Sequence, residues 1–256
     1  WPITLAALVA YVFVSTLVVY LFFRYVGGFD SKTAFFAGVP GGLNEMIILS
    51  QAAGGDDRQV SVMHTARIFL VVMTLPFVFR VIEDFEPGMR TFGDADTSLG
   101  SIDAIILVTS AAVGYFAARL LRIPAPHRTG PMITSAAIHL SGLTAAVPPV
   151  IAVAVAQVIL GSAVGARFDG LTFRDLGPIL KLGGTATVIL LAISALFSVA
   201  LQAVTGIPFG SLILAFSPGG LTEMSLVALA LEIDTAFVAT HHIARISVVV
   251  IAIPIF

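Results

Sequence analysis

Two short stretches of this sequence place charged side chains inside strongly apolar surroundings. In the second of them, Glu223, His242 and Arg245 follow the triplet Pro-Gly-Gly at 218–220. The histidine and the arginine are three residues apart, so they share one face of a helix. A charged side chain deep in a membrane is costly unless it has a partner. These residue types therefore predict either structural ion pairs or a binding site for an anion.

The same polar set occurs twice, 178 residues apart. Segment 40–78 aligns with segment 218–256 without a gap, and 16 of the 39 positions are identical. Because the costly polar residues repeat together with the apolar ones, the match indicates an internal duplication. The candidate solute- or ion-binding residues are Gly41, Gly42, Asn44, Glu45, His64, Arg67, Gln157, Gly219, Gly220, Thr222, Glu223, His242 and Arg245.

Glu45 and Glu223 each lie three residues after the second glycine, in the first turn of a predicted half-helix. A carboxylate there can satisfy free amide groups at the positive end of the helix dipole. It can also bind a cation or a proton, because intramembrane acids mark ion paths. We expect the glutamates to be the partners of Arg67 and Arg245. Two alternatives stay open: Arg–Glu bridges that lock the half-helices, and an anion site built from Arg, His and helix N-termini.

Other polar residues allow simpler interpretations. Asp56 and Asp234 precede predicted spans and are expected to be helix N-caps or solvated acids. His241 has no equivalent in the first copy and is interpreted as incidental. Gln157 is either a link between helices or a pore-facing group, and Gly161 and Gly165 after it predict a close helix-packing face.

The composition sets the class of protein. Hydrophobic residues make up 58% of the 256 residues and charged residues only 11%, whereas soluble domains carry about 25% charged residues. The chain is therefore predicted to be an all-α polytopic membrane protein, with the bilayer and a small solute or ion as partners. The net charge of −2 gives no reason to expect nucleic acid, and no cofactor or metal is predicted. The oligomeric state, including a homo-oligomer, is left open.

A crossing helix needs about 20 mostly apolar residues. Two such segments are odd, because Pro-Gly-Gly cuts them into two half-helices each: Thr33–Ala53 and Phe209–Leu231. Gly130–Leu143 is short and is either a half-span or a re-entrant segment. With the six clear spans this gives about eight or nine membrane segments. The clear spans are Ile3–Phe23, Val60–Val81, Ile102–Leu121, Val147–Ala166, Ile179–Val204 and Thr235–Phe256.

The repeat also predicts the organisation of the chain as one integrated membrane domain. Residues 1–83 form the second half of the first repeat, 84–101 an acidic loop, and 102–256 the second repeat. The front half of the second repeat, 102–177, has its counterpart before residue 1, so the first repeat lacks its front half, which predicts roughly 80–100 further N-terminal residues in the full protein. Whether the copies are parallel or inverted stays undecided. Eleven Lys and Arg residues lie outside the spans, and either arrangement places seven of them on the inner side of the membrane.

The motifs Pro-Gly-Gly-Leu-[Asn/Thr]-Glu-Met, each followed by His-x-Ala-Arg-Ile, resemble those of the duplicated AbrB-type membrane protein family. The stretches GPMITSAAIHLSG (130–142) and AQVILGSAVGARF (156–168) fit its other blocks. The resemblance covers nearly the whole chain apart from the acidic loop. It implies an integral inner-membrane protein of bacteria. Some members are labelled ammonia monooxygenases and others regulators of gene expression, so the resemblance does not supply a substrate.

Three functions compete. The leading hypothesis is a secondary transporter or permease for a small anionic or carboxylate-bearing solute, bound between the two broken helices near mid-membrane. The second is a membrane regulator that binds a ligand without transporting it. The third, a metal-dependent monooxygenase, is disfavoured because the sequence has only five histidines and both repeated ones stand beside an arginine.

Overall fold

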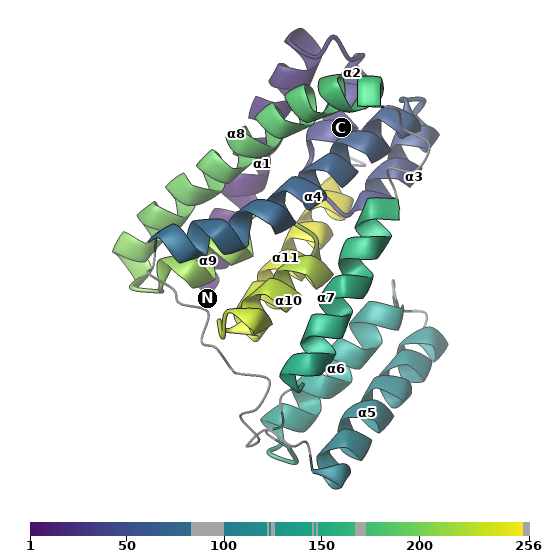
Figure 1. The fold of residues 1–256 in the computed structure, drawn as a ribbon, viewed down its shortest axis with the longest axis vertical. Coiled ribbons are helices and arrows are strands. Elements are labelled where there is room, and N and C mark those ends of the chain that lie inside the picture. The colour runs from purple at the N-terminus through teal and green to yellow at the C-terminus, as the bar shows by residue number, and fades with distance from the viewer. Residues whose placement is uncertain are drawn as a thin grey trace. The chain divides into compact units, whose positions relative to one another are not determined.

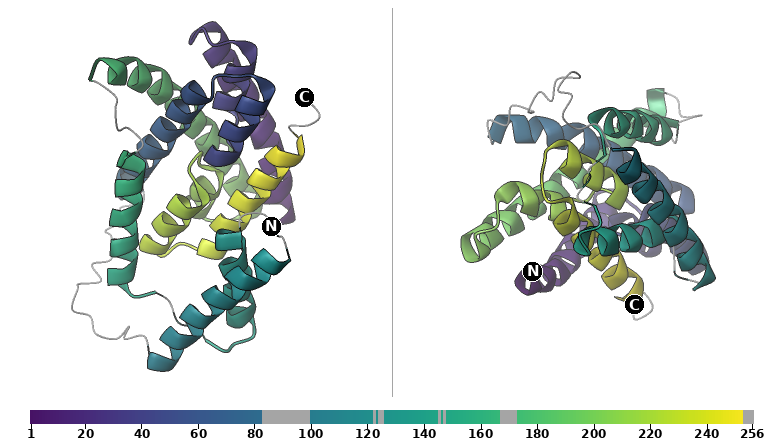
Figure 2. Two further views of the ribbon diagram at one scale, coloured as in Figure 1. Left: turned by 90° about the vertical axis from the view of Figure 1, so that its right-hand side faces the viewer. Right: turned by 90° about the horizontal axis from the view of Figure 1, so that it is seen from below.

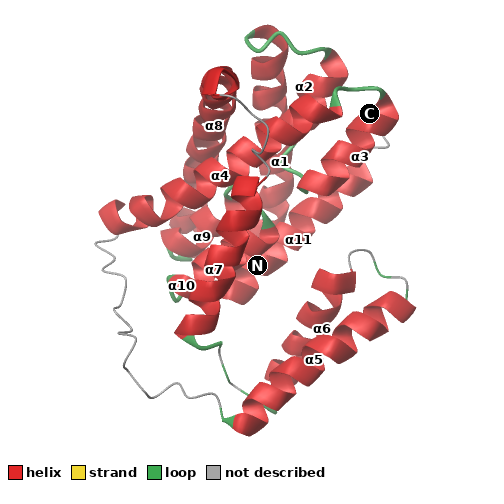
Figure 3. Cartoon of the chain, turned by 45° about the vertical axis from the view of Figure 1, so that its right-hand side comes forward, coloured by secondary structure: helices red, strands yellow, loops and turns green. Residues whose placement is uncertain are grey.

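The structure is a computed structural model that describes residues 1–82, 100–121, 123, 126–144, 146, 148–166 and 173–252. All regular secondary structure in these ranges is helical (Figure 3). The acidic loop predicted at 84–101 lies almost wholly outside the described residues. In chain order the helices are α1 (Pro2–Tyr25), α2 (Ser31–Gly38), α3 (Leu43–Ala53), α4 (Asp57–Ile82), α5 (Ser101–Leu120), α6 (Pro126–Leu140), α7 (Val150–Gly165), α8 (Phe173–Thr205), α9 (Phe209–Phe216), α10 (Leu221–Ala230) and α11 (Thr235–Ala252).

The helices have the composition of membrane spans. Five described helices, α1, α4, α5, α8 and α11, are long and apolar enough to cross a bilayer. Their outer faces expose large apolar side chains, such as Leu17 at 58% and Leu196 at 68%, while Ser15, Ser194 and Ser198 are fully buried. Polar groups inside and apolar groups outside suit a lipid environment. The predicted all-α polytopic membrane protein is confirmed.

The chain forms two compact units, one of residues 90–154 and one of residues 1–89 with 155–256. In the first, α6 lies against α5, and their backbones approach closely at Gly114 and Gly130. A Cβ atom on either glycine would overlap the carbonyl group of the other. The Thr134 hydroxyl donates to the Ser110 carbonyl at 2.9 Å. The short segment that could have been a half-span is thus a 15-residue helix packed along a longer one.

In the larger unit the helix boundaries repeat with the same spacing as the sequence. The starts of α2, α3 and α4 at residues 31, 43 and 57 become residues 209, 221 and 235 in α9, α10 and α11. Each difference is 178 residues. A long helix, α1 or α8, precedes each set. The two copies therefore share one order of elements: a long helix, two half-helices and a second long helix.

Helices α2 and α3 form a hairpin and not one interrupted crossing. The Lys32 ammonium group, near the start of α2, donates to the Ala53 carbonyl at the end of α3 at 2.6 Å. The Asp56 amide donates to the Thr33 hydroxyl at 2.8 Å. The two ends of the segment therefore lie together, and the Pro-Gly-Gly triplet at 40–42 is its tip. The predicted pair of half-helices is present, and the segment returns to the side from which it enters.

The two copies run in opposite directions. Helix α1 runs from the N-terminus toward the top of Figure 1, whereas α8 runs from the top toward the lower left. Helices α4 and α11 are opposed in the same way, and the views in Figure 2 agree. This is an inverted-topology repeat, in which the hairpins α2–α3 and α9–α10 enter from opposite sides. The distribution of Lys and Arg left this point undecided.

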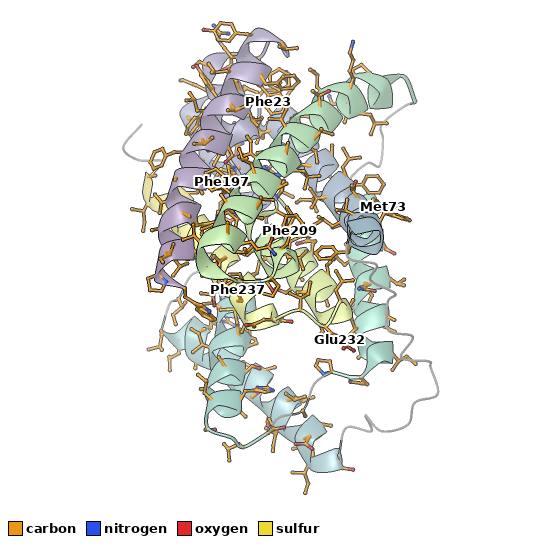
Figure 4. All side chains as sticks on the ribbon, turned by 90° about the vertical axis from the view of Figure 1, so that its left-hand side faces the viewer. Phe23, Met73, Phe197, Phe209, Glu232 and Phe237 are labelled. Carbon is orange, nitrogen blue, oxygen red and sulfur yellow. The ribbon has the colours of Figure 1, made fainter. Side chains whose placement is uncertain are left out.

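Tyr11 lies where α1, α8 and α9 meet in the core of the larger unit. Its ring packs edge-to-face on Phe197 and Phe216, with centroid distances of 5.6 and 5.5 Å. Phe197 extends from α8 beside α1 (Figure 4). The Tyr11 hydroxyl lies 3.1 Å from the Ser194 Oγ. Tyr11 therefore connects the long helix of one copy to that of the other.

Aspartates begin three of the helices. Asp30 caps α2 by accepting from the amides of Lys32 and Thr33, and hydrogen bonding, first from the Thr33 side chain, holds the pKa of this carboxyl below its usual value. Asp56 accepts from the Gln59 amide at 2.9 Å at the start of α4. Asp234 accepts from the Phe237 amide at 3.0 Å at the start of α11. The prediction of N-caps at Asp56 and Asp234 is confirmed.

Candidate functional site: two clamped helix breaks

Each break begins where proline removes a backbone donor. In a continuous helix the amide of residue 40 would donate to the carbonyl of Phe36, but Pro40 has no N–H. The His64 side chain supplies the missing donor, with its Nε2 atom 2.8 Å from the Phe36 oxygen. In the second copy Pro218 likewise gives the Leu214 carbonyl no amide donor, and this oxygen accepts from His242 Nε2 and from the Ser217 hydroxyl, both at 3.0 Å.

The arginine of each motif binds two further carbonyls along the break. Arg67 donates from Nη1 to the Val39 oxygen at 3.2 Å and from Nη2 to the Gly41 oxygen at 3.3 Å. In the second copy Arg245 donates from Nη1 to the Ser217 oxygen and from Nη2 to the Gly219 oxygen, both at 2.6 Å. The sequence offsets are the same in both copies. We call each set of histidine, arginine and bound carbonyls a carbonyl clamp.

Hydrogen bonding fixes the protonation of the two histidines. In each clamp an arginine Nη2 atom lies 3.0 Å from the Nδ1 atom of the histidine, His64 or His242. A guanidinium can only donate, so Nδ1 must accept, and a carbonyl can only accept, so Nε2 must carry the proton. Both rings are therefore neutral and in the Nε2–H form. Each histidine links its arginine to the end of the half-helix.

The clamp places a positive charge at the negative end of a half-helix. The last carbonyls of a helix have no partners within it, and they carry the negative end of the helix dipole. Arg67 and Arg245 satisfy these groups at the ends of α2 and α9. This corrects the expectation that Glu45 and Glu223 are the partners of the arginines, because backbone carbonyls and histidines occupy that role.

The glutamates lie at the other side of each break. Gly42 is the N-cap of α3 and Glu45 stands in its first turn, as Gly220 and Glu223 do in α10. A Cβ atom on either N-cap glycine would overlap the carboxylate of its glutamate. Each half-buried carboxylate thus folds back over the positive end of its half-helix. This arrangement supports the capping role that the sequence allowed.

The glycines of the breaks provide space and not unusual backbone angles. Gly42 has φ −69° and Gly220 has φ −81°, values open to any residue. A Cβ atom on Gly41 would approach the Met46 sulfur to 2.9 Å, and one on Gly219 would approach the Met224 sulfur to 2.7 Å. The first glycine of each pair makes room for a buried methionine, and the second makes room for the carboxylate.

The remaining predicted site residues lie apart from the clamps. Asn44 and Thr222 are exposed at the second positions of α3 and α10, and Gln157 is exposed on α7. A Cβ atom on Gly161 or Gly165 would meet no atom within 4 Å among the described residues. The predicted packing face on α7 is therefore not packed within the described part of the chain.

His241 has a structural partner that the sequence did not indicate. Its Nδ1 atom lies 2.8 Å from the Phe237 oxygen and its Nε2 atom 2.9 Å from the Thr4 hydroxyl. It therefore ties α11 to α1. Among the described residues, no three His, Asp or Glu side chains converge as a metal-ligand set.

Tyr11 is a buried residue near both arginines that the sequence analysis did not identify. Its hydroxyl lies within electrostatic reach of both Arg245 and Arg67. It stands in an apolar run, and its counterpart 178 residues later is Ile189, so the repeat gave no signal for it. The two clamps have the same histidine and arginine and the same clamp hydrogen bonds in both copies, but only the first copy has a tyrosine at this position, since the second has Ile189.

Two re-entrant helix pairs in inverted copies define a class of polytopic membrane protein built by duplication. The chain belongs to the AbrB family: the family model described as "Transition state regulatory protein AbrB" matches residues 1–256. This confirms the resemblance found in the motifs.

Two bacterial relatives are similar over most of this chain. It is 30% identical to the Bacillus subtilis protein YhjN over 243 residues, which are 89% of this chain and 63% of YhjN. It is 27% identical over 256 residues to an Escherichia coli protein whose name describes it as a regulator, AbrB, covering 96% of this chain and 70% of that protein. The chain thus spans less than two thirds of the length of YhjN. No solved structure matches.

Proposed function

We propose that the protein is a secondary transporter or permease for a small anionic or carboxylate-bearing solute, which it binds between the two hairpin tips near mid-membrane. One observation carries the proposal. Two re-entrant hairpins enter from opposite sides and end in tips held by the same carbonyl clamp. In transporters of inverted-repeat design, half-helix ends of this kind face substrate and coupling ions.

The clamps suggest how the tips would work in transport. Each tip is tied to its long helix, α4 or α11, through a histidine and an arginine, so tip and helix would move as one body. Rocking of one copy against the other would then open the site to alternate sides. Glu45 and Glu223 are the proposed countercharges, which a solute, a proton or Na⁺ would displace from the half-helix ends. The bacterial inner membrane is the proposed location.

The names of the family and of one relative favour a second candidate, because both describe a regulator. A regulator would bind its ligand in the same site and pass a conformational change to a partner without net flux. The two candidates differ in one measurable quantity, which is movement of solute across a membrane.

Flux into proteoliposomes tests the proposal. The full-length protein is expected to drive counterflow of at least one labelled solute from a panel of carboxylates and amino acids. Glu223→Gln, which keeps the shape of the side chain, is expected to slow this flux about tenfold or more, since a tenfold change needs only about 1.4 kcal/mol. Arg24→Gln, at an exposed position, is the matched control and is expected to keep the wild-type rate.

Two outcomes would count against the proposal. Tight binding of a panel member without counterflow would favour the regulator. Normal transport by both Glu223→Gln and Arg245→Ala would show that solute passes elsewhere and that the site assignment is wrong.

A further inference from the structure

The two buried arginines carry donors that no described residue accepts. Arg67 is 4% exposed and Arg245 is 1% exposed. Their Nη atoms bind the carbonyls and histidines of the clamps, but the Nε–H group of each has no partner among the described residues. The same atom is free in both copies, so this feature belongs to the duplicated motif. A buried donor without an acceptor is costly in an apolar medium, so each Nε–H group requires an acceptor that the described residues do not supply.

The two guanidinium groups are close enough to affect one another. Arg67 experiences the positive charge of Arg245, and the Tyr11 hydroxyl interacts electrostatically with both. Two like charges brought together in a membrane interior repel each other and need a counterion. The region between the arginines and Tyr11 is therefore electropositive.

Hydrogen bonds fix the position of Tyr11 relative to the second clamp. The Tyr11 hydroxyl lies 3.1 Å from the Ser194 Oγ, and the Ser194 hydroxyl lies 3.0 Å from the Phe216 carbonyl oxygen. The next carbonyl, that of Ser217, binds Arg245. Tyr11 is thus two hydrogen bonds from the backbone that the second arginine holds.

The protein's own charges leave a single positive charge there. Glu45 and Glu223 fold over their N-cap glycines, at the start of α3 and α10, on the other side of each break from the bound carbonyls at the ends of α2 and α9. The ends of α2 and α9 each contribute about half a negative charge. Against two guanidinium groups, they leave about one positive charge uncompensated.

We propose that one singly charged carboxylate completes this site, with one oxygen on the Arg67 Nε–H, the other on the Arg245 Nε–H, and the Tyr11 hydroxyl at its edge. A carboxylate offers two acceptor oxygens in a plane, which suits two separate donors. A dicarboxylate carries two negative charges, more than the one uncompensated positive charge of the site. Chloride is a single atom and does not offer two separate acceptor oxygens. The inference deepens the proposed function. It rests on that function at one point, which is that the bound carboxylate belongs to the transported solute.

Thermal unfolding of the purified full-length wild-type protein in detergent tests the site with simple probes. Acetate is expected to raise the unfolding midpoint in a saturable way. Acetamide, which has the same shape without charge, is expected to leave it unchanged. Chloride and succinate are expected to stabilise less than acetate at equal ionic strength. Equal midpoints in acetate and acetamide, or in acetate and chloride, would overturn the proposal without any variant.

Variants then assign the atoms. Tyr11→Phe keeps the ring packing and is expected to weaken acetate binding several-fold in titration calorimetry. Arg245→Gln is expected to weaken it at least tenfold, and Arg24→Gln is expected to leave it unchanged. If Arg245→Gln does not fold, Arg67→Gln and Tyr11→Phe carry the test. Wild-type affinity in Tyr11→Phe together with either folded arginine variant would contradict the assignment.

Binding and flux separate this inference from the proposed function. Acetate binding that depends on the arginines, without flux of any solute, would retain the carboxylate site and reject transport. Flux of a solute by a protein that does not distinguish acetate from acetamide would retain transport and reject this site.

Discussion

Arg245→Ala is expected to lower the free energy of unfolding by about 2–4 kcal/mol, because it leaves three buried acceptors without their donor. These are the carbonyls of Ser217 and Gly219 and the Nδ1 atom of His242. The Arg245 side chain is only 1% exposed, so in the interior of a membrane protein water does not replace the hydrogen bonds that it donates. Chemical or thermal unfolding of the full-length protein in detergent measures the change.

The chain offers a control for this variant on its surface. Arg24 also donates to a backbone carbonyl, that of Phe29 at 2.9 Å, but it is exposed. Arg24→Ala is expected to change the free energy of unfolding by less than about 0.5 kcal/mol. Arg67→Ala is expected to act like Arg245→Ala, with a smaller effect because its hydrogen bonds are longer. Equal stability of the Arg24 and Arg245 variants would contradict the carbonyl clamp.

His242→Met is the second large effect that we expect, a loss of about 2–3 kcal/mol of folding free energy. Methionine approximates the volume of histidine but cannot donate to the Leu214 carbonyl, which then keeps only the Ser217 hydroxyl as a donor. It also offers no strong acceptor to Arg245. The same unfolding measurement applies, and the variant is also expected to lower flux because the tip is no longer tied to α11.

The neighbouring histidine provides the matched comparison. The first copy has Met63 where the second has His241, so His241→Met introduces the residue that the duplicated fold already accepts. This variant loses the hydrogen bonds to Thr4 and Phe237 and the ring contacts with Phe216 and Phe237, and about 1 kcal/mol is expected. A loss at His241 equal to that at His242 would mean that general packing, not the clamp, explains both.

Much of the site could be predicted from residue types and the repeat. The breaks, the His–Arg pairs and the aspartate caps follow from Pro-Gly-Gly, from a spacing of three and from the position before a span. The partners of Arg67 and Arg245 were predicted wrongly, because every residue has a backbone carbonyl and the residue types do not show which carbonyls lack a donor. One signal was present: Pro40 has no amide, so the Phe36 carbonyl had to find another donor.

Other features could not be read from the sequence for physical reasons. Tyr11 lies in an apolar span and faces Ile189 in the alignment of the copies, so neither polarity nor repetition marks it. The opposite directions of the copies depend on whether each broken segment crosses or returns, and apolar length alone is the same in both cases. The contact of Lys32 with Ala53 resolves this for the first hairpin.

The central claim is that two equivalent hairpins enter the membrane from opposite sides, and cysteine labelling tests it most directly. The 256 residues contain no cysteine. Ala52 in α3 and Ala230 at the end of α10 are exposed, equivalent positions 178 residues apart. Single Ala52→Cys and Ala230→Cys variants of the full-length protein, with any cysteine outside these residues removed, would be treated with a membrane-impermeant maleimide in intact cells. The structure predicts that one position reacts at once and the other only after the membrane is permeabilised; reaction of both from the same side would contradict it.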